Sequence, residues 1–175
     1  MIFSWGKRQK RRPDDMAQLH AAIVAAALEP AVYLEGEVED SFEGRFESLT
    51  LHTWLVMRRL GALPPPGPER AQELVDRTFT GLDHTLRELG VADVVVPRTM
   101  KKLAGSFLGR IEAYEAAYAA GDPAQLRAAL SRNVMGGRDA ELLARFVEGA
   151  IPGLNEMDID EIFGDAPLFP SWSGL

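Results

Sequence analysis

The segment from Glu73 to Tyr114 constrains the fold of this chain more than any other stretch. On both sides of a short break at Gly90–Pro97, its apolar residues recur at three- and four-residue steps, the spacing of one face of an α-helix. We therefore expect two long amphipathic helices, from about 69 to 89 and from about 98 to 120. Their apolar faces comprise Val75, Phe79, Leu82, Leu86 and Leu89, and then Met100, Leu103, Phe107, Ile111, Tyr114 and Tyr118.

Four further helices are expected in the rest of the chain. The first begins at Asp14–Asp15 and ends near Pro30, because aspartate caps a helix and proline interrupts one. The second, from 46 to 60, is apolar on nearly every side, so we expect it in the middle of the core. Two later helices begin at aspartate caps, and the segment 31–45 is predicted to be an extended loop. These two caps are Asp122 and Asp139.

The sequence therefore predicts an all-α protein with a single domain of about six helices. We expect a basic tail at 1–13, the helical domain at 14–152 and an irregular tail at 153–175, with one turn around 158–163. A hydrophobic content of 46% and a charged content of 26% are typical of globular proteins. The absence of cysteine excludes disulfides and thiolate metal sites. No apolar run approaches the roughly 18 residues of a membrane span, and no secretory signal is recognised, so a cytoplasmic location is expected.

The basic tail contrasts with the rest of the chain. Residues 1–13 contain five basic residues and no acidic one, whereas the whole chain has a net charge of −7. Such a segment can meet anionic lipid, at about 1 kcal/mol per basic residue, or ribosomal RNA, or it can be a solubilising tail. The acidic body argues against specific DNA binding. The candidate surface contacts of the tail are Trp5, Lys7, Arg8, Lys10, Arg11 and Arg12.

The first long helix carries a charged face that could suggest chemistry. Asp76, Asp83 and Arg87 fall on one line of the helix, and His84 and Glu88 lie beside them. Carboxylates and an imidazole can bind a metal or transfer protons, but a di-iron site in a helical bundle needs matching ligands on facing helices. No such motif is present. We therefore interpret the cluster as a solvated face with internal ion pairs, and we expect no catalysis, metal or cofactor.

Two further features allow two interpretations each. His52 lies on the apolar helix, where a histidine is more often a hydrogen-bonded core residue than a haem ligand. Gly105 and Gly109 allow another backbone to approach the second long helix. That backbone can belong to a helix of the same domain, or to a partner helix in a docking groove.

Six short runs, taken in order, resemble the ubiquinol–cytochrome c chaperone family, and the resemblance covers about 30–150. The order and spacing of these runs together carry the resemblance. They are Leu51–Leu60, Asp76–Phe79, Leu82–Val91, Val96–Leu103, Gly109–Tyr114 and Leu130–Val134.

The resemblance implies a non-catalytic assembly chaperone that binds newly made cytochrome b while the respiratory bc1 complex is built. It also implies a membrane-associated setting, with a ribosome contact and a small partner protein in mitochondrial members; this chain looks like a bacterial member. The alternatives are a metal- or haem-handling helical protein and an adaptor for the ribosome or the membrane surface. The candidate partner contacts are His52, Trp54, Arg58, Arg59, Asp76, Asp83, His84, Arg87, Glu88, Lys101, Lys102, Arg110 and Tyr114.

Overall fold

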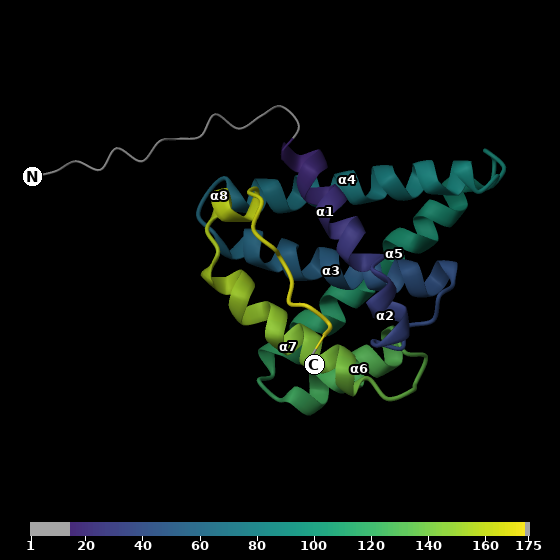
Figure 1. Ribbon diagram of the computed structural model, residues 1–175. Coiled ribbons are helices and arrows are strands. Elements are labelled where there is room, and N and C mark those ends of the chain that lie inside the picture. The colour runs from purple at the N-terminus through teal and green to yellow at the C-terminus, as the bar shows by residue number, and fades with distance from the viewer. Residues whose placement is uncertain (1–14, 174–175) are drawn as a thin grey trace, which may run out of the picture.

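The computed structural model describes residues 15–173, and every regular element in that range is a helix (Figure 1). The expected all-α single domain is therefore confirmed, although short helices at 30–34 and 159–162 add to the six expected. In chain order the elements are α1 (Asp15–Ala27), α2 (Pro30–Leu34), α3 (Phe42–Ala62), α4 (Gly67–Glu88), α5 (Val96–Ala119), α6 (Pro123–Asn133), α7 (Glu141–Glu156) and α8 (Ile159–Ile162).

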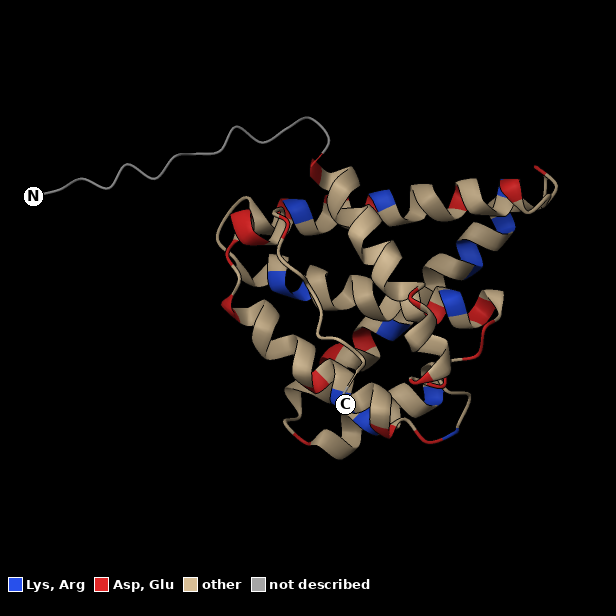
Figure 2. Ribbon diagram, in the orientation of Figure 1, with Lys and Arg blue, Asp and Glu red and all other residues tan. Residues whose placement is uncertain are grey.

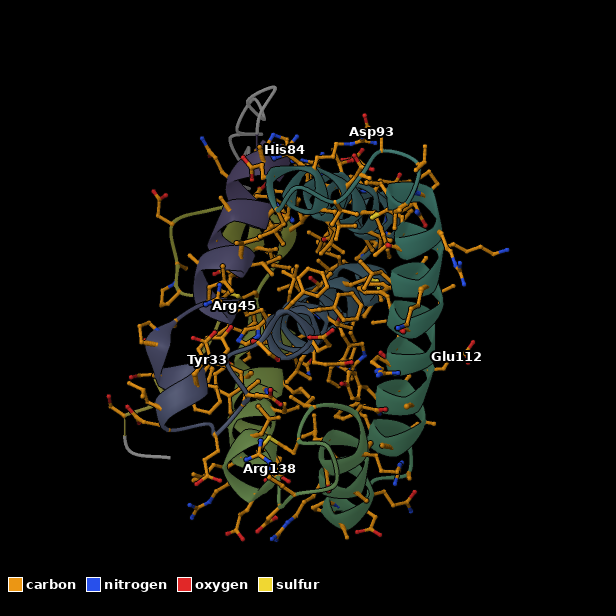
Figure 3. The ribbon with its side chains drawn as sticks, turned by 90° about the vertical axis from the view of Figure 1, so that its right-hand side faces the viewer. Tyr33, Arg45, His84, Asp93, Glu112 and Arg138 are labelled. Atoms are coloured by element: carbon orange, nitrogen blue, oxygen red, sulfur yellow. The ribbon has the colours of Figure 1, made fainter. Side chains whose placement is uncertain are left out.

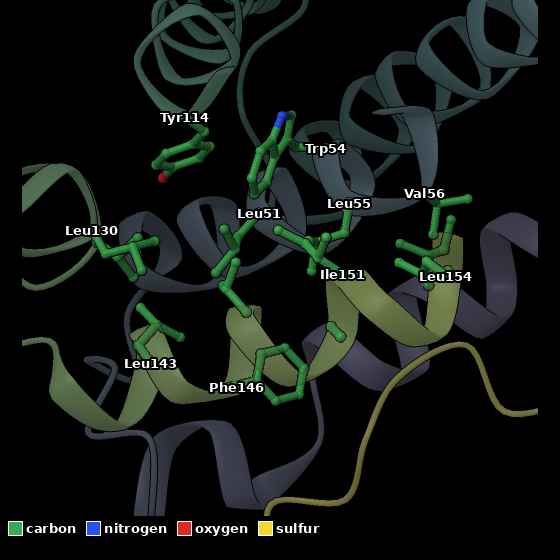
Figure 4. Packing of buried hydrophobic residues seen from close by; sticks show 14 of the residues in the cluster. Leu51, Trp54, Leu55, Val56, Tyr114, Leu130, Leu143, Phe146, Ile151 and Leu154 are labelled. Atoms are coloured by element: carbon green, nitrogen blue, oxygen red, sulfur yellow. The ribbon is translucent and has the colours of Figure 1, made fainter. Parts of the chain in front are cut away.

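Helix α3 is the centre of the molecule. It packs against α1, α4, α5 and α7, so apolar side chains are buried on all of its sides, as its sequence predicts. Trp54 faces Tyr114 of α5, while Leu51 and Leu55 lie on the side toward α7 (Figure 4). A smaller apolar cluster around Phe107 joins α3, α4 and α5 beside the main core.

The predicted helix ends are largely confirmed. Gly90 and Gly121 follow α4 and α5 with φ angles of 79° and 66°, a backbone conformation that glycine adopts without steric cost. Asp122 caps α6, where its side chain accepts a hydrogen bond from the Ala124 amide at 3.0 Å. Asp158 opens the expected single turn, α8, with a capping box.

The extended loop expected at 31–45 is wrong over much of its length. Pro30 stands at the first helical position of α2, and Ser41 caps α3 by accepting a hydrogen bond from the Gly44 amide at 3.1 Å. Both are local start signals that the mixed polarity of this segment obscured. Only residues 35–41 remain outside the helices.

Helix α7 also differs from the expectation. Its N-cap is Ala140, one residue after the expected Asp139, whose carboxylate accepts a hydrogen bond from Arg127 Nη2 at 2.7 Å. The helix continues through Pro152 to Glu156, so the irregular tail begins later than predicted. Proline removes only one backbone hydrogen bond, and the buried residues around it, such as Leu154, hold the last turn in the core.

The stretch Asp15–Leu34 is long and apolar, although polar residues interrupt its apolar runs. Among the described residues it alone is long and apolar enough, by length and composition, to cross a membrane, and 22% of it is buried. The core helices of soluble proteins and signal sequences have the same length and composition. Beyond Asp15, α1 carries no aspartate, glutamate, lysine or arginine, so Figure 2 shows it uniformly tan; His20 is its one further titratable residue.

Candidate functional site

The charged face of α4 forms the ion pairs that its helical spacing predicts. Arg87 Nε donates to Asp83 Oδ2 at 2.7 Å, and Arg87 Nη1 lies 2.5 Å from Asp93 Oδ1. His84 Nδ1 lies 3.3 Å from Glu88 Oε2. The hydrogen bond from Arg87 lowers the pKa of Asp83 below its usual value. Figure 3 places His84 and Asp93 together at one end of the molecule.

Asp76 lies two turns before Asp83, the first residue of this group, and accepts a hydrogen bond from Gln72 Nε2 at 2.9 Å. Within residues 15–173, no three histidine, cysteine, aspartate or glutamate side chains are grouped so that they could hold a metal ion. The charges on the polar face of α4 are thus paired within and next to the helix, and a binding role for this face stays a prediction.

Arg58 and Arg59 join α3 to the end of α7. Arg58 stacks over the Tyr118 ring, with its guanidinium carbon 4.0 Å from the ring centroid, and donates to Asn155 Oδ1 at 3.2 Å. Arg59 Nε donates to the Met157 carbonyl oxygen at 2.8 Å. Both guanidinium groups thus have intramolecular partners, and a binding role for them stays a prediction.

Three of the predicted contacts lie inside the protein. His52 is 1% exposed, and Trp54 and Tyr114 are fully buried. Trp54 Nε1 donates to Glu115 Oε1 at 2.7 Å, and the Trp54 and Tyr114 ring centroids are 5.2 Å apart. A partner could touch these three side chains only if the segments that cover them moved, so in this structure they act as core residues.

Arg110 holds a buried carboxylate that the sequence did not reveal. Its Nη2 and Nε donate to the two oxygens of Glu47 at 2.8 and 3.1 Å. Burial raises the pKa of Glu47 above its usual value, and the hydrogen bond from Arg110 opposes that shift. The pair joins α3 to α5. Glu47 could not be singled out because an isolated glutamate on a helix usually faces water.

Arg110→Met is expected to cost about 2 kcal/mol of stability near neutral pH, because it leaves the Glu47 carboxylate buried without its cation. The raised pKa of Glu47 means that the folded state binds the proton more tightly, so stability falls as pH rises through that pKa. Urea unfolding should therefore show a smaller loss at about pH 5 than at neutral pH. The double variant E47Q/R110M should regain much of the loss; equal losses at both pH values would contradict the explanation.

The outer face of α5 is open. Lys101 and Lys102 are exposed, and a Cβ added at Gly105 or Gly109 would meet nothing within 4 Å. Close packing against another helix of the same domain, one of the two interpretations of these glycines, is therefore wrong. The candidate contacts of the basic tail lie outside the described residues; these are Trp5, Lys7, Arg8, Lys10, Arg11 and Arg12.

An apolar groove opens between α1, α3 and α4, with a volume of about 490 Å³. Two exposed leucines, Leu28 at 45% and Leu89 at 65%, stand on its walls. Its other apolar and small lining residues come from all three helices. They are Val24 from α1, Phe42, Phe46 and Leu49 from α3, and Thr78, Gly81, Leu82 and Thr85 from α4.

The polar residues of this groove carry little net charge. At the rim of the groove, near the start of α3, Arg45 Nε lies 2.7 Å from Asp40 Oδ1. Figure 3 shows Arg45 beside α1. Burial, together with the nearby Arg77, lowers the pKa of His20 and so favours its neutral form. The groove, which we call the α1/α4 groove, suits an apolar segment better than a charged ligand.

Sequence reasoning missed this groove because its residues resemble core residues. Leu89 was expected on the buried face of α4, and Leu28 was not singled out. Each lies just past the last residue of its helix, Ala27 of α1 and Glu88 of α4. That position is a weak signal of exposure, because helix ends are often covered by other segments.

The described residues thus define an all-helical domain with an open apolar groove between three of its helices. The family model described as ubiquinol-cytochrome C chaperone matches residues 34–169, so the chain belongs to the ubiquinol–cytochrome c chaperone family. The crystal structure of the Cbp3 homolog from Brucella abortus is similar, with 36% identity and a TM-score of 0.80 over 92% of this chain and 91% of that one. No curated protein matches the chain.

Proposed function

We propose that this protein is a non-catalytic chaperone that binds newly made cytochrome b during assembly of the bc1 complex. The match to the chaperone family over residues 34–169 carries the proposal. The similarity to the Cbp3 homolog supports it, since it extends over nearly the whole of both chains. A client of this kind would be met on the cytoplasmic side of the membrane, so we also propose a peripheral location on its inner face.

The α1/α4 groove is the surface that best suits such a client. A transmembrane segment before insertion is apolar, and a groove lined by leucine, valine and phenylalanine can shield it from water. The uncharged surface of α1 extends this apolar region on one side of the groove. We therefore place the client segment against α1 and the second half of α4.

Capture of the client tests the function itself. The tagged protein, purified from membranes in mild detergent, should carry cytochrome b, and a deletion strain should contain less assembled bc1 complex. Immunoblots and reduced-minus-oxidised haem spectra of the membranes measure both. Normal amounts of the complex without the chaperone would refute the proposed function.

Leu28→Glu and Leu89→Glu test the groove. Each places a carboxylate where an apolar client would be buried, and the desolvation should reduce capture about tenfold or more. Leu108→Glu is the matched control, because Leu108 is 60% exposed on α5, away from the groove. All three side chains are exposed, so thermal unfolding should change little. Equal capture by the three variants would exclude the groove while leaving the function open.

A further inference from the structure

The last described residues, 165–173, form a segment that we call the C-terminal strap. It leaves α8 and runs across α3 between α1 and α7, as the yellow trace in Figure 1 shows. Two of its side chains are buried, Leu168 at 9% and Trp172 at 4% exposure. The strap thus covers apolar surface that would otherwise face water.

Aromatic packing holds the strap in place. Trp172 stacks on Phe146 of α7, with ring centroids 4.3 Å apart and planes 5° from parallel. Its ring also fills the space left by Gly36, where a Cβ would lie 2.8 Å from the indole carbons. Phe169 meets the His52 ring edge to face at 4.8 Å. The contacts resemble those of a bound peptide whose aromatic side chains occupy pockets.

No hydrogen bond joins residues 165–173 to another part of the described chain; the one within this range runs from the Ser173 amide to Ser171 Oγ at 3.2 Å. A crevice of about 1060 Å³ separates the strap from α1, whose wall is formed largely by alanines such as Ala22 and Ala25. Side-chain packing alone therefore opposes release of the strap, and space is already open along one of its sides.

His52 adds a polar group to the floor beneath the strap. Its Nδ1 lies 2.8 Å from the Ser48 carbonyl oxygen, and because that oxygen can only accept, Nδ1 carries the hydrogen. Nε2 is then an acceptor, and this buried atom has no hydrogen-bond partner. The ring of Phe169, which lies against the imidazole, has no N–H or O–H group that can donate to it. The strap therefore leaves one buried acceptor unsatisfied, which is costly.

We propose that the strap is an internal ligand in an apolar peptide groove between α1, α3 and α7. The groove exchanges it for an apolar client segment that presents an N–H or O–H donor to His52 Nε2. Such a segment would reproduce the aromatic packing and also satisfy the imidazole, which Phe169 cannot do. This groove would be a second client-binding site, on the side of α1 away from the α1/α4 groove. The identity of its client rests on the proposed chaperone function.

A reversible lock tests the exchange, since the chain contains no cysteine of its own. A Cβ at Gly149 would lie 3.7 Å from Pro170 Cγ, so Gly149→Cys with Pro170→Cys places two thiols within reach of a disulfide. A labelled peptide that copies residues 165–173 serves as the probe, and fluorescence anisotropy measures its binding. The reduced protein should bind it about tenfold or more tightly than the oxidised protein, because the lock removes the open state.

The single variant Gly149→Cys, treated with the same oxidant, is the matched control and should bind equally in both states. A chain that ends at Gly164 should bind the probe more tightly than the full chain. If it does not fold, the lock still decides the question. Equal binding by the oxidised and reduced double variant would overturn the exchange.

A peptide series tests the role of His52. The phenylalanine that copies Phe169 is replaced by serine, tyrosine or tryptophan, each of which offers a donor. At least one of these three peptides should bind the protein several-fold more tightly than the parent peptide. A peptide with leucine at the same position, which offers no donor, should not. Failure of all three would overturn the donor requirement. Because synthetic peptides replace cytochrome b, these results separate failure of the groove from failure of the proposed function.

Discussion

Replacing Trp54 with alanine should lower the free energy of unfolding by about 3–5 kcal/mol, the usual cost of removing a large aromatic side chain from a core. Trp54 is fully buried on α3, and its ring packs against Tyr114 of α5. The rigid packing of the four helices around α3 limits how far the cavity can collapse. Glu115 also loses the hydrogen bond from the indole. Urea unfolding monitored by circular dichroism gives the difference.

Leu108→Ala is the matched control for this substitution. It also removes a large apolar side chain from α3's neighbour α5, but Leu108 is 60% exposed, so the change should stay within about 0.5 kcal/mol. A loss below about 1 kcal/mol for Trp54→Ala would show that α3 does not organise the core as described.

The protein should lose about 3 kcal/mol of stability between pH 6.5 and pH 4 through His52 alone. Burial lowers the pKa of His52 from 6.5 to about 4, while the hydrogen bond to the Ser48 carbonyl opposes the shift. In this window the unfolded chain binds a proton at this residue and the folded chain does not. Falling pH therefore stabilises the unfolded state, and above pH 6.5 the contribution is constant.

His52→Gln isolates this contribution, because glutamine keeps a polar side chain but does not titrate. Its unfolding free energy should fall less steeply between about pH 6.5 and pH 4 than that of the parent protein. The remaining slope includes His20, whose pKa is also lowered by burial. Parallel pH profiles for the two proteins would mean that His52 titrates normally and that water reaches it.

Both predictions concern residues, Trp54 and His52, whose burial the sequence indicated but whose neighbours it did not. The all-round apolar pattern of the α3 sequence predicted that Trp54 lies in the core, and a core role was one of the two interpretations of His52. Neither pattern indicates which residues cover a side chain. Phe169, more than 100 positions further along the sequence, packs on the His52 ring, and Trp172 stacks on Phe146, which also contacts His52.

In the candidate site, too, contacts within one helix could be predicted from the sequence and contacts between helices could not. The ion pairs of Arg87 and Asp83 followed from their spacing within one helix, because a four-residue step brings side chains together locally. The pair of Arg110 and Glu47 joins two helices, and nothing in the local sequence connects these residues. Which predicted contacts can meet a partner is likewise decided by packing between helices.

The sequence by itself determined the helices, most of their ends and the family, because helical spacing, caps and short motifs are properties of neighbouring residues. Only the tertiary structure decided that Leu28 and Leu89 remain exposed beside a groove, while equally apolar residues of the same helices are buried. An apolar stripe has the same spacing whether another helix or water lies against it. Its exposure depends on residues far along the chain, and those are brought into place only when the helices pack.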